Sequence, residues 1–257
     1  MPSYATPDSR NIYCGTGEIW FNRFDTSGAA TAWRHLGDVS KLDLTPTATT
    51  IEHQSSMNAA RAVDAQAITA VKMAVAMDLS EFAKENMALA LLGAASAYTQ
   101  TLVTKTAAAL GDALLGYALD AGGQKIVVTD VKKASTSLVL GIDYTVDSDA
   151  GLITILESNT VGVVDGDALT WDGSIPAFTS TQVQGLANGQ ILGALRFRSS
   201  ADAVGPRKLV DIWRLSIAPS GALAMLGNAF GAISLTGDAL LDSTKPVGQQ
   251  FCRVIDL

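Results

Sequence analysis

Between Ala67 and Met77 the sequence alternates strictly between two kinds of side chain. Successive side chains of a β-strand point to opposite faces, so this alternation predicts a strand with one face in a core and the other on a separate surface. The expected core set is Thr69, Val71, Met73, Val75 and Met77, and the other set is Ile68, Ala70, Lys72, Ala74, Ala76 and Asp78. The second set is mostly small and uncharged, which favours a flat wall built from subunits side by side.

A polar segment without a strong apolar stripe precedes this strand. It runs from Thr45 to Ala65, after a strand expected over Trp33–Leu44 and before the alternating strand, which is expected to begin at Gln66. A loop of this length inside a compact domain is usually functional or disordered. We interpret the segment as a long β-hairpin arm.

A short helix is expected after the alternating strand. Ser80 can cap its first turn, and Glu81 favours the positive end of the helix dipole. Phe82, Leu89 and Leu92 follow at helical spacing, so we expect a helix packed on a sheet.

The rest of the chain predicts a mainly β protein with an inserted module. From Thr106 to about Ser180, short β segments are separated by Gly-rich and Asp-rich turns, which is typical of a small sandwich or barrel. Long strands resume after Gly189, and a tight turn is expected at Pro219-Ser220-Gly221. We therefore expect a discontinuous β-sandwich core over 1–100 and 185–257, with a β-rich module over 101–184.

Composition favours buried contact between subunits. Hydrophobic residues make up 48% of the chain and charged residues only 17%. The net charge of −7 disfavours gripping of nucleic acid, which needs a basic patch. The nearest basic group, made of Arg196, Arg198, Arg207 and Lys208, is expected to flank a hairpin. Cys14 and Cys252 lie near opposite ends and are expected to be reduced thiols.

Signals for chemistry are weak, so we expect no enzyme, cofactor or metal. His35 and His53 have no metal-ligand spacing, and no GxSxG, GxxxxGK[ST] or CxxC motif occurs. Asp143, Asp147 and Asp149 resemble a calcium loop in composition but fail its register. The weakly charged run 218–235 contains Pro and Gly and predicts strands and turns rather than a membrane helix.

The order of the elements carries a family resemblance. The motifs in order are Leu36-Gly37-Asp38-Val39, the polar arm, the alternating strand, Leu79-Ser80-Glu81-Phe82, Leu195-Arg196-Phe197-Arg198, Val210-Asp211-Ile212-Trp213 and Phe230-Gly231-Ala232-Ile233. This series resembles the major tail tube proteins of tailed bacteriophages, particularly those with long non-contractile tails, over about 12–95 and 189–257. The middle segment departs from the minimal family pattern, although Asp143-Tyr144-Thr145-Val146-Asp147 looks like phage tail material.

The resemblance implies a β-sandwich with one helix, whose subunits form hexameric rings that stack into a tube and conduct DNA during ejection. The arm would cross to a neighbouring ring, and the module would lie on the tube exterior. The implied partners are further copies of the chain and the tail terminator, tape measure and distal tail proteins. DNA would pass without specific binding, no membrane would be involved, and the protein would reside in the virion tail after assembly in the host cytoplasm.

Three sets of residues follow as candidate sites. The inter-ring arm comprises Thr45, Pro46, Glu52, His53, Gln54, Asn58 and Arg61. The barrel wall face comprises Ala70, Lys72, Ala74 and Ala76. Because DNA must slide without sticking, acids are expected in the lumen, and the candidates are Asp38, Asp43 and Asp78.

The alternative is a β-sandwich binding module of an adhesin or carbohydrate-binding type. Exposed aromatic residues would favour it. The four tryptophans, Trp20, Trp33, Trp171 and Trp213, are scattered along the sequence and discriminate weakly. A hydrolase on a β scaffold is disfavoured, because no catalytic constellation is seen.

Overall fold

The computed structural model describes residues 11–57, 61–202 and 204–257. As the sequence predicts, the protein is mainly β, with 56% of residues in strands and 3% in one helix. The chain divides into two compact units, which we describe separately: unit 1 comprises residues up to 96 together with 183–257, and unit 2 comprises 97–182. These limits lie a few residues from those expected from the sequence.

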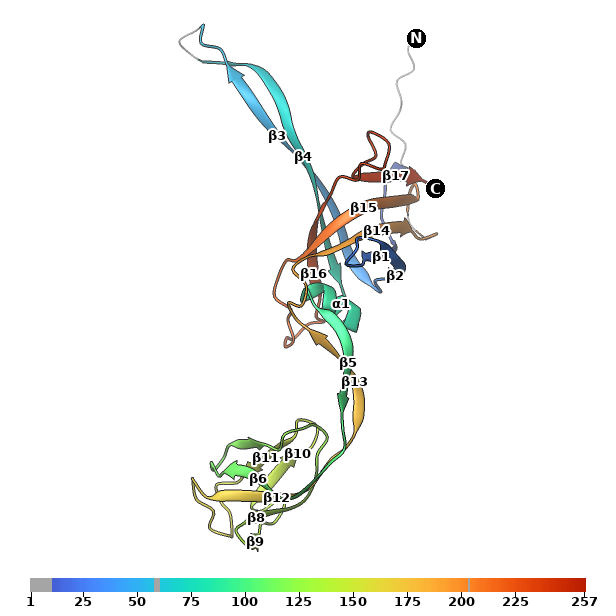
Figure 1. Ribbon diagram of the computed structural model, residues 1–257. Coiled ribbons are helices and arrows are strands. Elements are labelled where there is room, and N and C mark those ends of the chain that lie inside the picture. Colours follow the sequence, from blue (N-terminus) through green and yellow to red (C-terminus); the bar gives the residue numbers. More distant parts are fainter. Residues whose placement is uncertain (1–10, 58–60, 203) are drawn as a thin grey trace. The chain divides into compact units, whose positions relative to one another are not determined.

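Unit 1 is built on one antiparallel sheet (Figure 1). Its strand order is β2-β1-β14-β15-β16-β4-β3, and β17 also pairs with β15. The strands are β1 (Gly17–Phe24), β2 (Ala30–His35), β3 (Val39–Gln54), β4 (Val63–Leu79), β14 (Ile191–Ser199), β15 (Lys208–Pro219), β16 (Ile233–Ala239) and β17 (Cys252–Asp256).

The sheet curves strongly around its core. Leu42 of β3 lines the same hollow of about 490 Å³ as Ile19 of β1 and Val210 of β15, although these strands are far apart in the strand order. The apolar cluster inside this curve includes Val75, Ile212, Leu215 and other buried side chains from most strands of the sheet. One face of the sheet therefore faces the core, which gives unit 1 its sandwich-like character.

The alternation in β4 is confirmed over its second half only. Met73, Val75, Met77 and Leu79 are buried, whereas the residues between them are partly exposed. The expectation that Thr69 and Val71 lie in the core is wrong, because both are exposed. β16 pairs with β4 only from Ala74 to Leu79, so the first part of β4 has no sheet or core beneath it.

The strand expected over Trp33–Leu44 is two strands, β2 and β3. Between them, Leu36 turns inward, and its N–H donates to the carbonyl oxygen of Ile19 at 2.9 Å. Gly37 follows with a φ of +83°, a backbone conformation that glycine adopts without steric cost.

The helix, α1 (Lys84–Ala90), is shorter than expected and begins later. Ser80 is not its N-cap: that position is Ala83, and no side-chain cap bond is made. Ser80 instead donates its N–H to the carbonyl oxygen of Asp38, and the Glu81 carboxylate accepts the N–H of Asp38 at 3.0 Å. These bonds tie the start of β3 to the segment between β4 and α1. Leu89 joins the sheet core, so the helix does pack on the sheet.

The tight turn expected at Pro219-Ser220-Gly221 is also wrong. Pro219 is the last residue of β15, and residues 220–232 form a loop before β16. This loop exposes Met225, Leu226 and Phe230.

Unit 2 contains two small sheets around a second core. Their orders are β10-β11-β7 and β6-β12-β8-β9. The strands are β6 (Val103–Asp112), β7 (Ala118–Asp120), β8 (Val127–Lys133), β9 (Thr136–Ser137), β10 (Tyr144–Asp147), β11 (Leu152–Ile155) and β12 (Ala168–Ile175). Trp171 and Ile153 are fully buried between them. The chain enters and leaves this unit along a two-stranded ribbon, β5 (Ala94–Gln100) with β13 (Phe178–Gln184).

Candidate functional site

The arm is a regular two-stranded ribbon. β3 and β4 pair from Val39 with Leu79 to Gln54 with Val63, with register shifts at Val39/Lys41, Thr49/Thr50 and His53/Gln54. The N–H of Ser55 donates to the carbonyl oxygen of Ala62. Beyond Pro46 and Met73 the ribbon leaves the body of unit 1, and its side chains are exposed on both faces (Figure 1). The long β-hairpin arm expected from the sequence is therefore confirmed.

The expected arm residues lie on this ribbon or at its end. Thr45, Pro46, Glu52, His53, Gln54 and Arg61 are exposed, and Asn58 lies outside the described residues. The ring of His53 contacts the Asp64 carboxylate, with Nδ1 2.5 Å from Oδ1. This contact joins the two strands near the end of the arm.

Large apolar side chains on the arm are exposed to solvent. Ile51, Ile68 and Val71 are 61%, 66% and 56% exposed, and Met57 and Val63 are also exposed. This surface was not expected from the sequence, because Ile51, Met57 and Val63 fall in the segment interpreted as polar and Val71 was expected in the core. Isolated two-stranded ribbons are marginal in water, so this surface favours cover by another molecule.

β3 also presents an open edge. It is the last strand in the sheet order, and among the described residues no strand pairs with its outer side. An edge of 16 residues is a template for pairing with another chain.

A small-residue face lies on the side of the sheet opposite the core. Residues directly opposite each other in an antiparallel pair share a face. Ala74 lies opposite Thr45 and Asp238, and Ala76 lies opposite Asp43 and Thr236. We call this surface the small-residue face; its members are Lys41, Asp43, Thr45, Ala74, Ala76, Asp78, Ser234, Thr236 and Asp238.

The candidate wall and lumen residues meet only in part on this face. Ala74, Ala76, Asp43 and Asp78 share it, whereas Ala70 and Lys72 lie on the exposed arm and Asp38 precedes β3. Lys41 contacts Asp43 at 2.9 Å, and this hydrogen bond raises the pKa of the Lys41 ammonium. The Ser234 hydroxyl donates to Asp78 at 2.6 Å. The face carries mostly short side chains and is polar and lightly acidic.

A second surface was missed by the sequence analysis. One row of side chains crosses the sheet from β2 through β1, β14 and β15 to β17, and each residue lies opposite the next. In that order the residues are His35, Trp20, Arg196, Asp211 and Arg253. We call this the Trp/Arg face; its members are Trp20, Trp33, Arg196, Arg198, Leu209, Asp211, Trp213 and Arg253. The signal that could have found it is the i, i+2 spacing of Glu18 with Trp20 and of Arg196 with Arg198.

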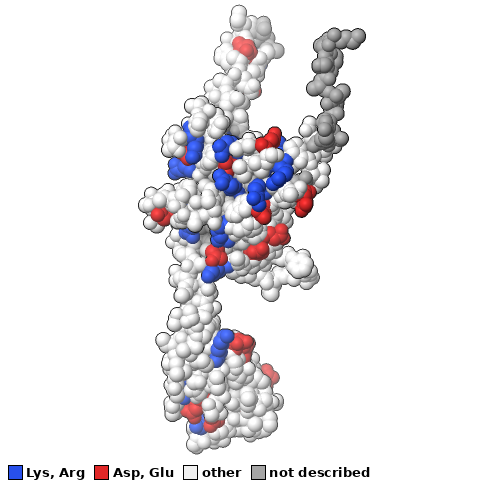
Figure 2. All heavy atoms as spheres, turned by 90° about the vertical axis from the view of Figure 1, so that its right-hand side faces the viewer, with Lys and Arg blue, Asp and Glu red and all other residues white. Residues whose placement is uncertain are grey.

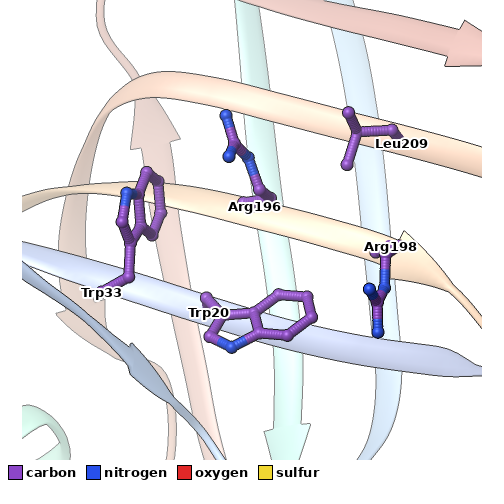
Figure 3. Close-up of a pocket in the computed structure, with 5 residues that line it drawn as sticks. All are labelled: Trp20, Trp33, Arg196, Arg198 and Leu209. Atoms are coloured by element: carbon purple, nitrogen blue, oxygen red, sulfur yellow. The ribbon is translucent and has the colours of Figure 1, made fainter.

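Arginine guanidinium groups lie over tryptophan rings on this face. The Arg196 guanidinium lies 5.1 Å from the ring centre of Trp33, and that of Arg198 lies 5.3 Å from the ring centre of Trp20. Together with Leu209 they line an open hollow of about 340 Å³ (Figure 3). Such contacts attract a cation to the ring face and hold both side chains in place.

Asp211 organises the centre of the Trp/Arg face. It is 2% exposed, and its two carboxylate oxygens accept from Arg196 at 2.6 Å and from Arg253 at 2.7 Å. Arg198 pairs separately with Glu18 at 2.8 Å. Figure 2 shows Lys and Arg gathered on this side of unit 1, with acids among them. The hairpin expected between Arg198 and Lys208 is confirmed, because β14 and β15 pair on either side of it.

Two of the calcium-like acids of unit 2, Asp143 and Asp147, have protein partners. The Asp143 carboxylate accepts from the N–H of Val139 at 2.8 Å and from the hydroxyl of Thr160 at 2.8 Å. Hydrogen bonds, first that of Val139, lower the pKa of Asp143 despite its burial. Asp147 accepts the N–H of Ala150 in a turn. These carboxylates hold turns together.

In the described part of the chain, no group of three metal-binding side chains occurs, and no helix is long and apolar enough to cross a membrane. Cys14 and Cys252 are free thiols, and burial raises the pKa of Cys252.

Comparison with known proteins gives a family but no activity. No curated protein matches the sequence. Residues 12–255 match the model of a family described as a protein of unknown function, UCP028589. The match spans the arm, both faces of the sheet and all of unit 2, so the chain belongs to this family.

Proposed function

We propose that the chain is the structural subunit of a phage tail tube, which assembles into hexameric rings that stack and conduct DNA during ejection. The observation that carries the proposal is the arm, with its exposed apolar side chains and the open edge of β3. The exposed apolar side chains and the open edge both need a partner chain. Further copies of the same chain can serve as this partner. Pairing of strand edges between subunits would close a barrel and remove the open edges.

The small-residue face supports a role in the tube wall. Side chains no larger than Thr along β4 and β16 let a wall run past a sliding polymer without obstruction. Asp43, Asp78 and Asp238 would give this wall a negative charge, which repels the DNA backbone. Asp38 lies outside the small-residue face, because it precedes β3.

Two deletions test the proposal. In the first, residues 50–69 are replaced by Asn-Gly, which joins the opposite residues Thr49 and Ala70 through a two-residue turn. The core half of β4 is kept, so we expect a folded chain that no longer forms tubes. In the second, residues 97–182 are replaced by a Gly/Ser linker, because unit 2 has its own core and would lie on the tube exterior. This variant should still assemble.

Negative-stain microscopy and sedimentation velocity of the purified proteins give the readout. The full chain and the unit 2 deletion should form rings or tubes, whereas the shortened arm should give smaller species. Tubes of normal length from the shortened arm would contradict the proposal. So would a full chain that stays monomeric at every soluble concentration.

A second candidate function is favoured by one observation. Trp20 and Trp33 lie side by side in an open hollow with two arginines (Figure 3), and aromatic platforms of this kind suit a β-sandwich binding module of the adhesin or carbohydrate-binding type. Saturable quenching of tryptophan fluorescence by glycans, lost in Trp33→Ala, would support this function.

A further inference from the structure

We infer that the Trp/Arg face is the docking site for the arm of a second copy of this chain. The inference rests on the proposed function, because it names the surface that receives the arm. Within one chain these two surfaces do not meet: the arm side chains are exposed, and Trp33 is 44% exposed. Each surface exposes side chains that the other could bind.

The chemistry of one arm face matches the Trp/Arg face. Thr50 lies opposite Ile68, and Glu52 lies opposite Gln66, so Ile68 and Glu52 share a face as diagonal neighbours. This places an apolar side chain beside a carboxylate. Neither has a contact that covers it, since Ile68 is 66% exposed and Glu52 is exposed.

The Trp/Arg face repeats this arrangement with the opposite charge. Trp20 lies opposite Arg196, and Glu18 lies opposite Arg198, so Trp20 and Arg198 are diagonal neighbours on one sheet face. Because both surfaces are antiparallel sheets, the spacing between the apolar and the charged side chain is the same on each. Ile68 can lie against the Trp20 ring while Glu52 meets the Arg198 guanidinium.

Charge also favours this pairing. Three guanidinium groups, from Arg196, Arg198 and Arg253, face two carboxylates, from Glu18 and Asp211. The Arg198 side chain is 50% exposed and pairs with the Glu18 carboxylate through one nitrogen, which leaves further N–H donors for a second carboxylate. A net positive surface on a chain of charge −7 is complementary to the acidic remainder of another copy.

Such a contact suits the proposed stack. The arm and the Trp/Arg face are different patches of one chain, so a copy that receives an arm still has its own arm available for a further copy. Used head to tail, the contact is heterologous and propagates into rings or filaments, whereas reciprocal exchange of arms would close a two-fold dimer. The proposed tube requires the head-to-tail use.

A charge-swap cycle on the full chain tests the inference. Arg198→Glu and Glu52→Arg each place like charges together, and each should raise the concentration for half-maximal assembly by about tenfold or more. The double variant restores opposite charges and should return to within about threefold of the original chain. Lys84→Glu is the matched control, since its side chain is 54% exposed and the charge change is the same.

The readouts are sedimentation velocity and negative-stain microscopy, with circular dichroism to show that each variant is folded. Rescue by the double variant supports the inference. Tubes that form equally in every variant overturn it and leave the tube function standing. A full chain that never assembles overturns both. Glycan binding at Trp20 and Trp33, with assembly indifferent to Glu52, assigns the face to another ligand and also overturns the inference.

Discussion

The outer face of one sheet carries two surfaces of opposite character. On β3, β4 and β16 it is small, smooth and lightly acidic, whereas on β1, β14 and β15 it is made of large rings and guanidinium groups. Both halves cover the same core and have the same antiparallel backbone. The comparison shows that burial dictates only every second residue of these strands. The remaining residues are free to serve whatever the exposed face contacts.

The two halves also differ in how firmly their side chains are held. On the Trp/Arg face, Asp211 fixes two arginines, and the Trp213 indole N–H donates to the carbonyl oxygen of Gln249 at 2.7 Å. On the small-residue face, the polar contacts are short-range, such as Lys41 with Asp43. A fixed side chain loses little entropy on binding, so the Trp/Arg face is prepared for a specific contact.

The largest difference should appear between aspartate substitutions on the two faces of β4. Val75→Asp places an unpaired carboxylate in the core and should destabilise unit 1 by at least about 4 kcal/mol, which abolishes folding. Ala74→Asp lies on the small-residue face opposite Asp238 and should cost only about 1 kcal/mol from like-charge repulsion. Circular dichroism shows whether each variant folds, and urea unfolding below the assembly concentration measures the stability of a folded variant. Equal stability of the two variants would show that the assignment of faces is wrong.

An intermediate effect should distinguish the Trp/Arg face from the small-residue face. Asp211→Ala leaves Arg196 and Arg253 without their shared carboxylate and should lower the free energy of unfolding by about 2 kcal/mol, a value reduced because both guanidinium groups are partly exposed. Asp238→Ala makes the same change on the small-residue face, where the acid is exposed, and should stay within about 0.5 kcal/mol. If Asp238→Ala is the more damaging of the two, the contrast drawn between the halves fails.

The smallest effect should be spectroscopic. Trp20, Trp33 and Trp213 all lie on the Trp/Arg face, and Trp171 is buried in unit 2. Assembly through the Trp/Arg face should therefore reduce acrylamide quenching of tryptophan fluorescence. Trp33→Phe should remove part of that reduction, while the small-residue face contributes no tryptophan signal. Quenching that is unchanged between monomer and assembly would exclude this face from the contact.

Sequence reasoning reached those parts of the fold that local patterns determine. The mainly β class, the buried positions from Met73 to Leu79 and the strands of the inserted module all follow from alternation and turn residues. The predicted start of α1 was wrong, because the Glu81 carboxylate accepts the N–H of Asp38 and does not lie in the first turn of the helix. Thr69 and Val71 were wrong because alternation does not reveal where a core stops beneath a strand.

The candidate site was less predictable than the fold. Asp43 and Asp78 share a face because of cross-strand register, in which a β-bulge between Val39 and Lys41 is decisive. Trp20, Trp33 and Trp213 are scattered in the sequence but lie on one face of the sheet, because β1, β2, β14 and β15 pair side by side. Local periodicity carries no information about such pairing, so the Trp/Arg face emerges only in the folded chain.

The order of the strands has a consequence for synthesis of the protein on the ribosome. β1 pairs with β14 and β4 pairs with β16, and all of unit 2 is translated between these partners. At about 5–20 residues per second, β1 and β4 each wait about 8–30 seconds with one edge unpaired. Unpaired edges beside an uncovered core are prone to aggregation during that time. Expression of this protein should therefore depend on chaperones, and on how quickly unit 2 itself becomes compact.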